Sequence, residues 1–360
     1  MDNFSIIIPT YNRPAHLSRI ISYYDSFGEN FRVIVADSSR DEHKGVNKGI
    51  VSSASNLNIL YLDNYSPETH PFQKFSDAVN HVEKKYCVFC ADDDFIVPGG
   101  IEASLAFLES NTDYAVAHGR YISFKVVNGS GNTQRYHWNF AYLPISIELP
   151  DPAARLELQL ADYTLPTVYG VHRSSILKKI YAEVLKSGVD LHMFGELLAT
   201  SLTVIFGKTK YMDTFYAARS EQTAGSGPGW PSVKDAIIEG TYDEKYPAFR
   251  KCLTSHLMEK TDMNSEEAGL IVDKAMTGYL KKFIARETLG LPRTKKRAVL
   301  DSIHLPEWID KTIMQSYVTS YRAVKKFSLY RIFIARPAFT RSRYRDDFNK
   351  IRRYVLSSSE

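Results

Sequence analysis

Hydrophobic positions in the first third of the chain alternate between short continuous runs and longer segments with helical spacing. Apolar runs typical of buried strands lie at residues 4–8, 32–36, 58–62 and 86–90. Two intervening segments repeat apolar residues on one helical face, with Leu17, Ile20, Ile21 and Tyr24 in the first and Phe72, Phe75, Val79 and Val82 in the second. This alternation predicts an α/β fold with a mostly parallel sheet and helices on both faces.

Local signals set the expected ends of these helices. Asn12 is expected to cap the first helix, whose first turn holds Pro14. Pro98 is expected to open a helix directly after the fourth strand.

The remaining chain predicts a second half and a helical region. Residues 115–127 and 133–140 are β-rich and flank a Gly- and Asn-containing turn, which predicts a hairpin. Helices are expected at 151–163, after a short strand within 168–185, and at 192–208, with a strand at 209–219. A Gly- and Pro-rich loop at 220–231 is predicted to be a lid or a domain boundary. Asn264 and Glu267 resemble a capping box before a further helix.

We therefore predict three regions. Residues 1–225 form a catalytic domain with halves at 1–112 and 113–225, residues 226–316 a helical domain, and residues 317–360 a basic amphipathic tail.

Polar clusters follow three of the predicted strands, at residues 10–12, 37–39 and 92–94. Ligands in such sheets bind beyond the carboxyl ends of the strands, so all three clusters are expected at one ligand-binding edge. The three consecutive aspartates at 92–94 form either a solvated surface turn or a site for a hard cation, whose charge would offset their repulsion.

The cysteine content and the lengths of the apolar runs indicate the cellular compartment that we expect for the protein. Cys87, Cys90 and Cys252 are too few for a disulfide framework, which suits a reducing compartment. Cys87 and Cys90 lie on a predicted strand and should point to opposite faces, so we interpret them as core residues and not as a zinc or redox pair. The first apolar run is too short for a signal peptide, and no window approaches the ~20 apolar residues that span a bilayer, so we expect a cytoplasmic protein.

The net charge of +4 is unevenly distributed, because residues 317–360 carry 11 Lys and Arg against 3 Asp and Glu. This tail interleaves basic and aromatic residues. It forms a solvated face, a covering for an acidic partner subunit, or a contact with the inner face of the membrane. Nothing else in the sequence supports a nucleic-acid partner.

Three motifs together resemble the donor-site segments of family-two nucleotide-sugar glycosyltransferases. They are SIIIPTYNR at 5–13, VADSS at 35–39 and ADDDFIVPGGI at 91–101, in the order and with the spacing of that family. The resemblance covers roughly residues 4–219. It implies the Rossmann-like A-type glycosyltransferase fold, in which a nucleotide-binding half is joined to an acceptor half.

The resemblance also implies roles for single residues. The nucleotide site would include Pro9, Thr10, Tyr11, Arg13, Asp37 and Lys74. The first three would line the base pocket, Asp37 would accept a hydrogen bond from a uracil ring, and Lys74 would face the nucleotide.

The aspartates admit two registers. Counting back from Pro98 places the metal on Asp93, with Asp92 toward the ribose, whereas a plain D-x-D spacing selects Asp92 and Asp94. In either register Mn²⁺ or Mg²⁺ would stabilise the departing nucleoside diphosphate.

The family's catalytic base begins a helix about a hundred residues after the aspartates. Glu196 fits this place best and Asp190 is the competitor, although Glu196 could also be an ordinary first-turn carboxylate. Arg219 is either a diphosphate ligand or a surface arginine. His172, in the acceptor-side segment 169–175, is more typical of a satisfied half-buried histidine than of a ligand.

The sequence thus predicts a metal-dependent, inverting glycosyltransferase with UDP as the favoured nucleotide. We expect a saccharide or lipid-linked saccharide acceptor, a role in surface polysaccharide synthesis, and a surface for a homo-oligomer in the helical C-terminal region. The alternatives are a nucleotidyltransferase, disfavoured because no glycine-rich loop follows the first strand, and a non-catalytic nucleotide-sugar binder, which would lack a base such as Glu196.

Overall fold

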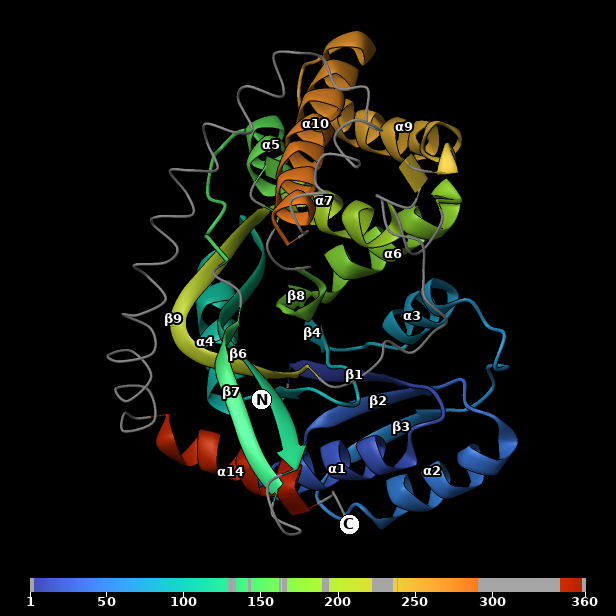
Figure 1. Cartoon of the computed structure of the whole chain (residues 1–360), viewed down its shortest axis with the longest axis vertical. Helices are drawn as coiled ribbons and strands as arrows, with labels where there is room; N and C mark the ends of the chain where they lie inside the picture. Colours follow the sequence, from blue (N-terminus) through green and yellow to red (C-terminus); the bar gives the residue numbers. More distant parts are fainter. Residues whose placement is uncertain are drawn as a thin grey trace.

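The computed structural model describes residues 3–128, 134–141, 144–161, 163, 167–189, 194–221, 236–237, 239–290 and 344–357. Within these residues a nine-stranded mixed sheet runs through the molecule, with helices on both of its faces (Figure 1). The strand order is β3-β2-β1-β4-β8-β6-β9-β5, and β7 pairs with β6 outside this path.

The first half contains the predicted parallel strands. They are β1 (Phe4–Thr10), β2 (Arg32–Asp37), β3 (Asn58–Leu62) and β4 (Tyr86–Phe89). Ile7 of β1 pairs with Ile34 of β2 and with Phe89 of β4, so the carboxyl ends of these strands lie at one edge. The predicted parallel sheet is confirmed.

Helices connect these strands. They are α1 (Pro14–Asp25), α2 (Asp41–Ser53), α3 (Pro71–Asn80) and, after the short β5 (Phe95–Ile96), α4 (Pro98–Ser110). The predicted apolar face of α1 is buried, and Pro98 opens α4 as expected. The sequence pattern did not predict α2, because Asn47 is its buried residue and its other positions show no apolar stripe.

The second half extends the sheet. Its strands are β6 (Tyr114–Asn128), β7 (Gln134–Ala141), β8 (Val171–Arg173) and β9 (Lys208–Ser220). Its helices are α5 (Pro152–Ala161), α6 (Ser174–Ser187) and α7 (Glu196–Phe206). The predicted hairpin is the antiparallel pair β6–β7, and β8 joins antiparallel to β4 and thereby links the two halves.

Two further helices pack on this half, α9 (Tyr242–Lys260) and α10 (Ser265–Gly290). The predicted capping box is present, since the Asn264 N–H donates to Glu267 Oε2 at 2.9 Å and the Glu267 N–H donates to Asn264 Oδ1 at 3.0 Å. Buried residues of both helices share one hydrophobic core with α5, α6 and α7.

The boundaries of the three predicted regions remain a prediction. Most of the predicted loop at 220–231 lies outside the described residues.

The sheet separates two hydrophobic cores. One lies under α3, α5, α6, α7, α9 and α10 and includes Cys87, and the other lies under α1 and α4 and includes Cys90. Both thiols are buried and free, which confirms that these cysteines point to opposite faces and belong to the core.

The described part of the basic tail packs on both halves of the molecule. Helix α14 (Arg345–Ser357) lies beside α1 and β7 (Figure 1) and buries Phe348, Ile351 and Val355. The ring of Phe348 lies 5.1 Å from that of Trp138. The apolar face of α14 is therefore used within the protein, and a membrane contact through the tail stays a prediction for its remaining residues. Among the described helices, none combines the length and the apolar character needed to cross a bilayer.

Candidate active site

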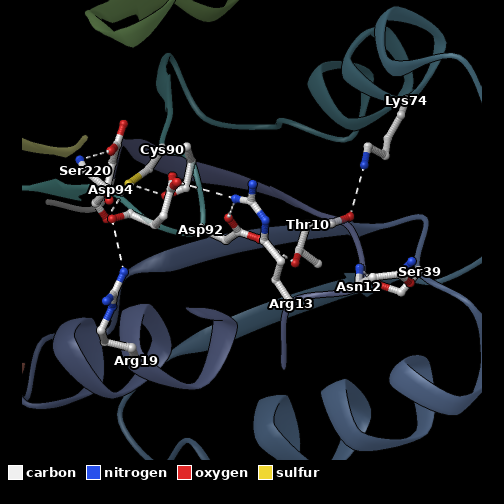
Figure 2. A network of polar contacts seen from close by, with 12 residues as sticks. Thr10, Asn12, Arg13, Arg19, Ser39, Lys74, Cys90, Asp92, Asp94 and Ser220 are labelled. Carbon is white, nitrogen blue, oxygen red and sulfur yellow. Dashed lines mark hydrogen bonds and ion pairs between the residues drawn. The ribbon is translucent and has the colours of Figure 1, made fainter. Parts of the chain in front are cut away.

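The site begins where β1 ends. Asn12 adopts a left-handed backbone conformation with φ of 54°, which asparagine tolerates better than most residues. Its N–H donates to Ser39 Oγ at 2.7 Å (Figure 2). Its Oδ1 accepts the Arg40 N–H at 2.9 Å. The prediction that Asn12 caps α1 was wrong, since Arg13 holds the N-cap position. Asn12 instead joins the ends of β1 and β2.

Asp37 fixes the end of β2. Its Oδ1 accepts the Ser39 N–H at 2.7 Å, and its Oδ2 accepts Asn47 Nδ2 and the Tyr61 hydroxyl, both at 2.7 Å. Burial, followed by the hydrogen bond to Asp37, raises the pKa of Tyr61. Asp37 is therefore buried at the predicted edge and held rigidly by its neighbours.

Lys74 reaches this edge from α3. Its ammonium donates to the Thr10 carbonyl at 3.0 Å (Figure 2). It also donates to Ser38 Oγ at 2.8 Å. Burial lowers its pKa to about 8, although Asp37 and Asp92 act in the opposite direction. The structure thus brings Lys74 to the predicted nucleotide site. Pro9 and Tyr11 are half-buried beside it.

Asp92 and Asp93 converge on one cationic nitrogen. Arg13 NH1 lies 2.9 Å from Asp92 Oδ1 and 3.4 Å from Asp93 Oδ2 (Figure 2). The Thr10 hydroxyl donates to Asp92 Oδ2 at 2.7 Å. Arg19 NH2 donates to the Asp93 carbonyl at 3.1 Å and so fixes the backbone of this turn.

Asp94 accepts hydrogen bonds from residues at the end of β9. Its Oδ2 accepts Arg219 Nε at 2.9 Å, and its Oδ1 accepts the Ser220 N–H at 2.8 Å. The Arg219 guanidinium also lies over the Tyr169 ring, 4.1 Å from its centroid. Arg219 is therefore part of the site, where it joins the end of β9 to the aspartate turn.

Burial raises the pKa of both Asp92 and Asp94 to about 6, while Arg13 lowers the first and Arg219 the second. The neighbouring Asp93 charge acts in the same direction as burial. These carboxylates thus gain from an additional positive charge at the turn.

The oxygens of Asp92 and Asp93 fit a hard divalent cation. Arg13 NH1 shows that both carboxylates reach one positive centre, and carboxylate oxygens are the ligands that Mg²⁺ and Mn²⁺ prefer. A cation bound by this pair would take the place of Arg13 NH1. Asp94 fits such a role less well, because both of its oxygens bind the end of β9.

Glu196 begins α7, as predicted, and its side chain is accessible to solvent. The Tyr163 hydroxyl donates to Glu196 Oε1 at 2.6 Å. The surrounding protein desolvates the carboxylate and raises its pKa, while Tyr163 and Arg219 lower it. Arg219 binds Asp94 directly and its charge lowers the pKa of Glu196, so the Glu196 carboxylate is within electrostatic reach of the aspartate turn. Asp190, the competing base, lies outside the described residues.

Gly195 allows Glu196 to occupy this position. A Cβ at residue 195 would overlap the ring of Phe72 on α3. That ring is confined by Phe75 and Tyr181, whose centroids lie 6.0 and 5.9 Å away. The start of α7 therefore approaches α3 more closely than any residue with a side chain would allow.

Gly195→Ala is expected to destabilise the fold by about 1–3 kcal/mol, the usual cost of overpacking a core. It should also lower catalytic activity, because Glu196 moves with the helix start. Thermal unfolding and activity assays measure both effects. Gly99→Ala on α4 is the matched control, since a Cβ there meets no atom within 4 Å. Equal stability of the two variants would contradict the close approach.

His172 belongs to the core. It is fully buried, its Nε2 lies 2.8 Å from the Thr167 carbonyl, and burial lowers its pKa to about 4.

Four residues that shape the site were not predicted from the sequence: Arg19, Asn47, Tyr61 and Tyr163. Their positions carry no motif, and only the fold brings them to the functional side chains.

This edge defines a class. A nucleotide-binding α/β half with an aspartate turn after its fourth strand, joined to a half that presents a carboxylate on a helix, is the A-type glycosyltransferase architecture. Residues 5–180 match the model of glycosyl transferase family 2. Within this segment the chain carries a glycosyl transferase family 2 domain.

Solved structures share the fold. A crystal structure of S. aureus TarS 1–349 in complex with UDP-GlcNAc is 16% identical, with 90% of each chain covered and a TM-score of 0.52. TarS 1–349 in complex with UDP is also 16% identical with 90% of each chain covered, at a TM-score of 0.49. In a third TarS structure, 15% identical with a TM-score of 0.48, the match covers 86% of this chain and 50% of TarS, so this chain spans about half of that protein. No curated protein matches the chain.

Proposed function

We propose that this protein transfers a sugar, with inversion, from a nucleotide-sugar to a hydroxyl group of a saccharide or lipid-linked saccharide. The observation that carries the proposal is the convergence of Asp92 and Asp93 on Arg13 at the carboxyl edge of the sheet. Arg219 binds Asp94 and lowers the pKa of Glu196, which supports a link between this edge and the candidate base.

The nucleotide would lie along the carboxyl ends of β1, β2 and β4. Among the described residues Asp37 Oδ1 accepts one hydrogen bond, so it keeps an acceptor position for the N–H of a uracil ring. Asp37 is buried, and this contact requires the covering side chains to move when the nucleotide binds. TarS, a structural neighbour, was crystallised with UDP-GlcNAc, which makes UDP-sugars the first donors to test.

Glu196 would act as the general base. Its carboxylate takes the proton of the acceptor hydroxyl, and that oxygen attacks the anomeric carbon from the face opposite the diphosphate. The bond between the anomeric carbon and the diphosphate oxygen breaks, which inverts the configuration. Arg13 and Arg219 supply guanidinium groups that can bind phosphate oxygens. A bound Mn²⁺ or Mg²⁺, held by Asp92 and Asp93, would stabilise the charge on the leaving group.

The alternatives fit less well. A non-catalytic nucleotide-sugar binder does not need a carboxylate such as Glu196 at the start of a helix near the donor site. A nucleotidyltransferase usually grips a triphosphate with a glycine-rich loop after β1, and residues 9–14 contain no glycine. A role in surface polysaccharide synthesis follows from the family resemblance and remains a proposal, as does a homo-oligomer.

Isothermal titration of UDP in the presence of Mn²⁺ or of EDTA tests the donor site. We expect binding that requires the cation, followed by slow hydrolysis of the matching UDP-sugar. Tighter binding of GDP or dTDP than of UDP would identify a different donor nucleotide and leave the proposed enzyme class unchanged. Failure of all three nucleotides to bind would contradict the proposal.

A further inference from the structure

A second cluster of metal-ligating side chains lies where α6 meets α9, among elements that do not contribute to the donor site. It consists of Glu183 on α6 and of Cys252 and His256 on α9. We propose that this cluster binds a zinc ion that fastens α9 to α6.

The ligand atoms already lie close together. Cys252 and His256 are four residues apart on one helix and therefore share a face. One ligand atom from each of the three residues lies within 4.8 Å of the other two. His256 Nε2 lies 3.2 Å from Glu183 Oε2. Ligand atoms around tetrahedral zinc are about 3.5 Å apart, given metal–ligand distances of about 2.0–2.3 Å. Small side-chain rotations are enough to close the site.

The other nitrogen of His256 is held by a carboxylate. Nδ1 lies 3.0 Å from Glu259 Oε2, and Lys179 Nζ lies 2.9 Å from Glu259 Oε1. Metal-binding histidines usually donate their second N–H to such a carboxylate, which fixes the ring and leaves the opposite nitrogen for the metal. Phe206 packs edge-on against the ring of His256, with centroids 5.1 Å apart.

The donor set selects zinc. A thiolate, an imidazole and a carboxylate together suit Zn²⁺ better than Mg²⁺ or Ca²⁺, which prefer oxygen ligands alone. Without metal, burial followed by the Glu183 charge raises the pKa of Cys252 to about 11. Binding would therefore release the thiol proton. Three protein ligands leave a fourth position for water.

This site could not be predicted from the sequence, because Glu183 lies far from α9 in the chain. The consequence would be structural. Helix α6 packs on α3, which carries Lys74, while α9 belongs to the C-terminal helical region. The zinc would fix that region to the helix pair behind the donor site. Without metal, the ring of His256 lies between Glu183 and Glu259, 3.2 Å and 3.0 Å from their carboxylate oxygens.

Titration of Zn²⁺ and Co²⁺ into the chelator-treated, full-length protein tests the proposal. We expect one zinc per chain, a Co²⁺ spectrum with a thiolate charge-transfer band, and protection of Cys252 from alkylation. The same binding should persist in Asp93→Ala, which separates it from the donor site. Cys252→Ser should weaken zinc at least tenfold and abolish the band, and His256→Gln should weaken zinc to a similar extent.

His43→Gln is the matched control, because His43 on α2 also lies beside a glutamate, Glu42, at 3.5 Å. It should leave zinc binding unchanged. Equal zinc affinity in the wild type and Cys252→Ser, or a folded wild type that binds no zinc, would overturn the proposal. Circular dichroism identifies any variant that fails to fold. If His256→Gln fails to fold, the Co²⁺ band and the alkylation of Cys252 in the wild type and in Cys252→Ser still test the proposal.

Discussion

Glu196→Gln is expected to lower the rate of sugar transfer by about 10²- to 10⁴-fold, the usual contribution of a general base. Gln keeps the size of the side chain and its oxygen can still accept the Tyr163 hydroxyl, so the helix start should not move. UDP affinity should stay within about twofold, because the base acts on the acceptor. Transfer kinetics and UDP titration on the same preparation measure both quantities.

The pH profile gives a second measurement on this residue. The surrounding protein raises the pKa of Glu196 by desolvating its carboxylate, so this group takes up a proton at a higher pH than a glutamate in water does. A base must be deprotonated, and transfer should therefore rise with pH through this raised pKa. The rising limb should disappear in Glu196→Gln.

The same shift makes unfolding a useful control. The folded state holds the proton more tightly than the unfolded state, so ionisation of Glu196 costs stability above its raised pKa. Glu196→Gln should then be at least as stable as the wild type near neutral pH. Glu157→Gln on α5, whose carboxylate pairs with Lys274 at 2.7 Å, serves as a surface control. Full transfer activity in Glu196→Gln would exclude it as the base and direct attention to Asp190.

Asp93→Asn is expected to weaken Mn²⁺-dependent UDP binding by about 10- to 100-fold, since it removes one anionic ligand of a hard cation. Binding measured in EDTA should change little. Titration of UDP at fixed Mn²⁺ measures the loss. Asp92→Asn should act in the same direction, because Asp92 and Asp93 reach the same positive centre.

Asp94→Asn distinguishes the two possible registers of the motif. Both Asp94 oxygens bind Arg219 and Ser220, so this change should loosen the end of β9 and leave metal dependence intact. If Asp94→Asn abolishes metal dependence while Asp93→Asn preserves it, the D-x-D register is correct.

Much of the fold could be predicted from the sequence, because its signals are local. The apolar runs at β1, β2, β3 and β4 allow little besides buried strands, and their order fixes the edge where residues 10–12, 37–39 and 92–94 meet. The hydrogen bond between Thr10 and Asp92, which are 82 positions apart, confirms that expectation.

What could not be predicted depends on distant partners. Asn12 looked like a helix cap, but Ser39 and Arg40 draw it into another conformation. Tyr163 has no motif, and only the packing of the second half brings it to Glu196. The tail looked like a candidate membrane helix because amphipathic spacing does not say what covers the apolar face. In the structure β7 and α1 cover it.

The position of α14 has a consequence for synthesis on the ribosome. Domains generally fold as units, the N-terminal part first, as the chain emerges at about 5–20 residues per second. Here Tyr23 of α1, early in the chain, lies 5.7 Å from the ring of Tyr354. The nucleotide-binding half therefore emerges first but keeps part of its apolar surface open until residues 344–357 have been made. During that interval this apolar surface is exposed on the nascent chain, and the half can be completed only after residues 344–357 have left the ribosome.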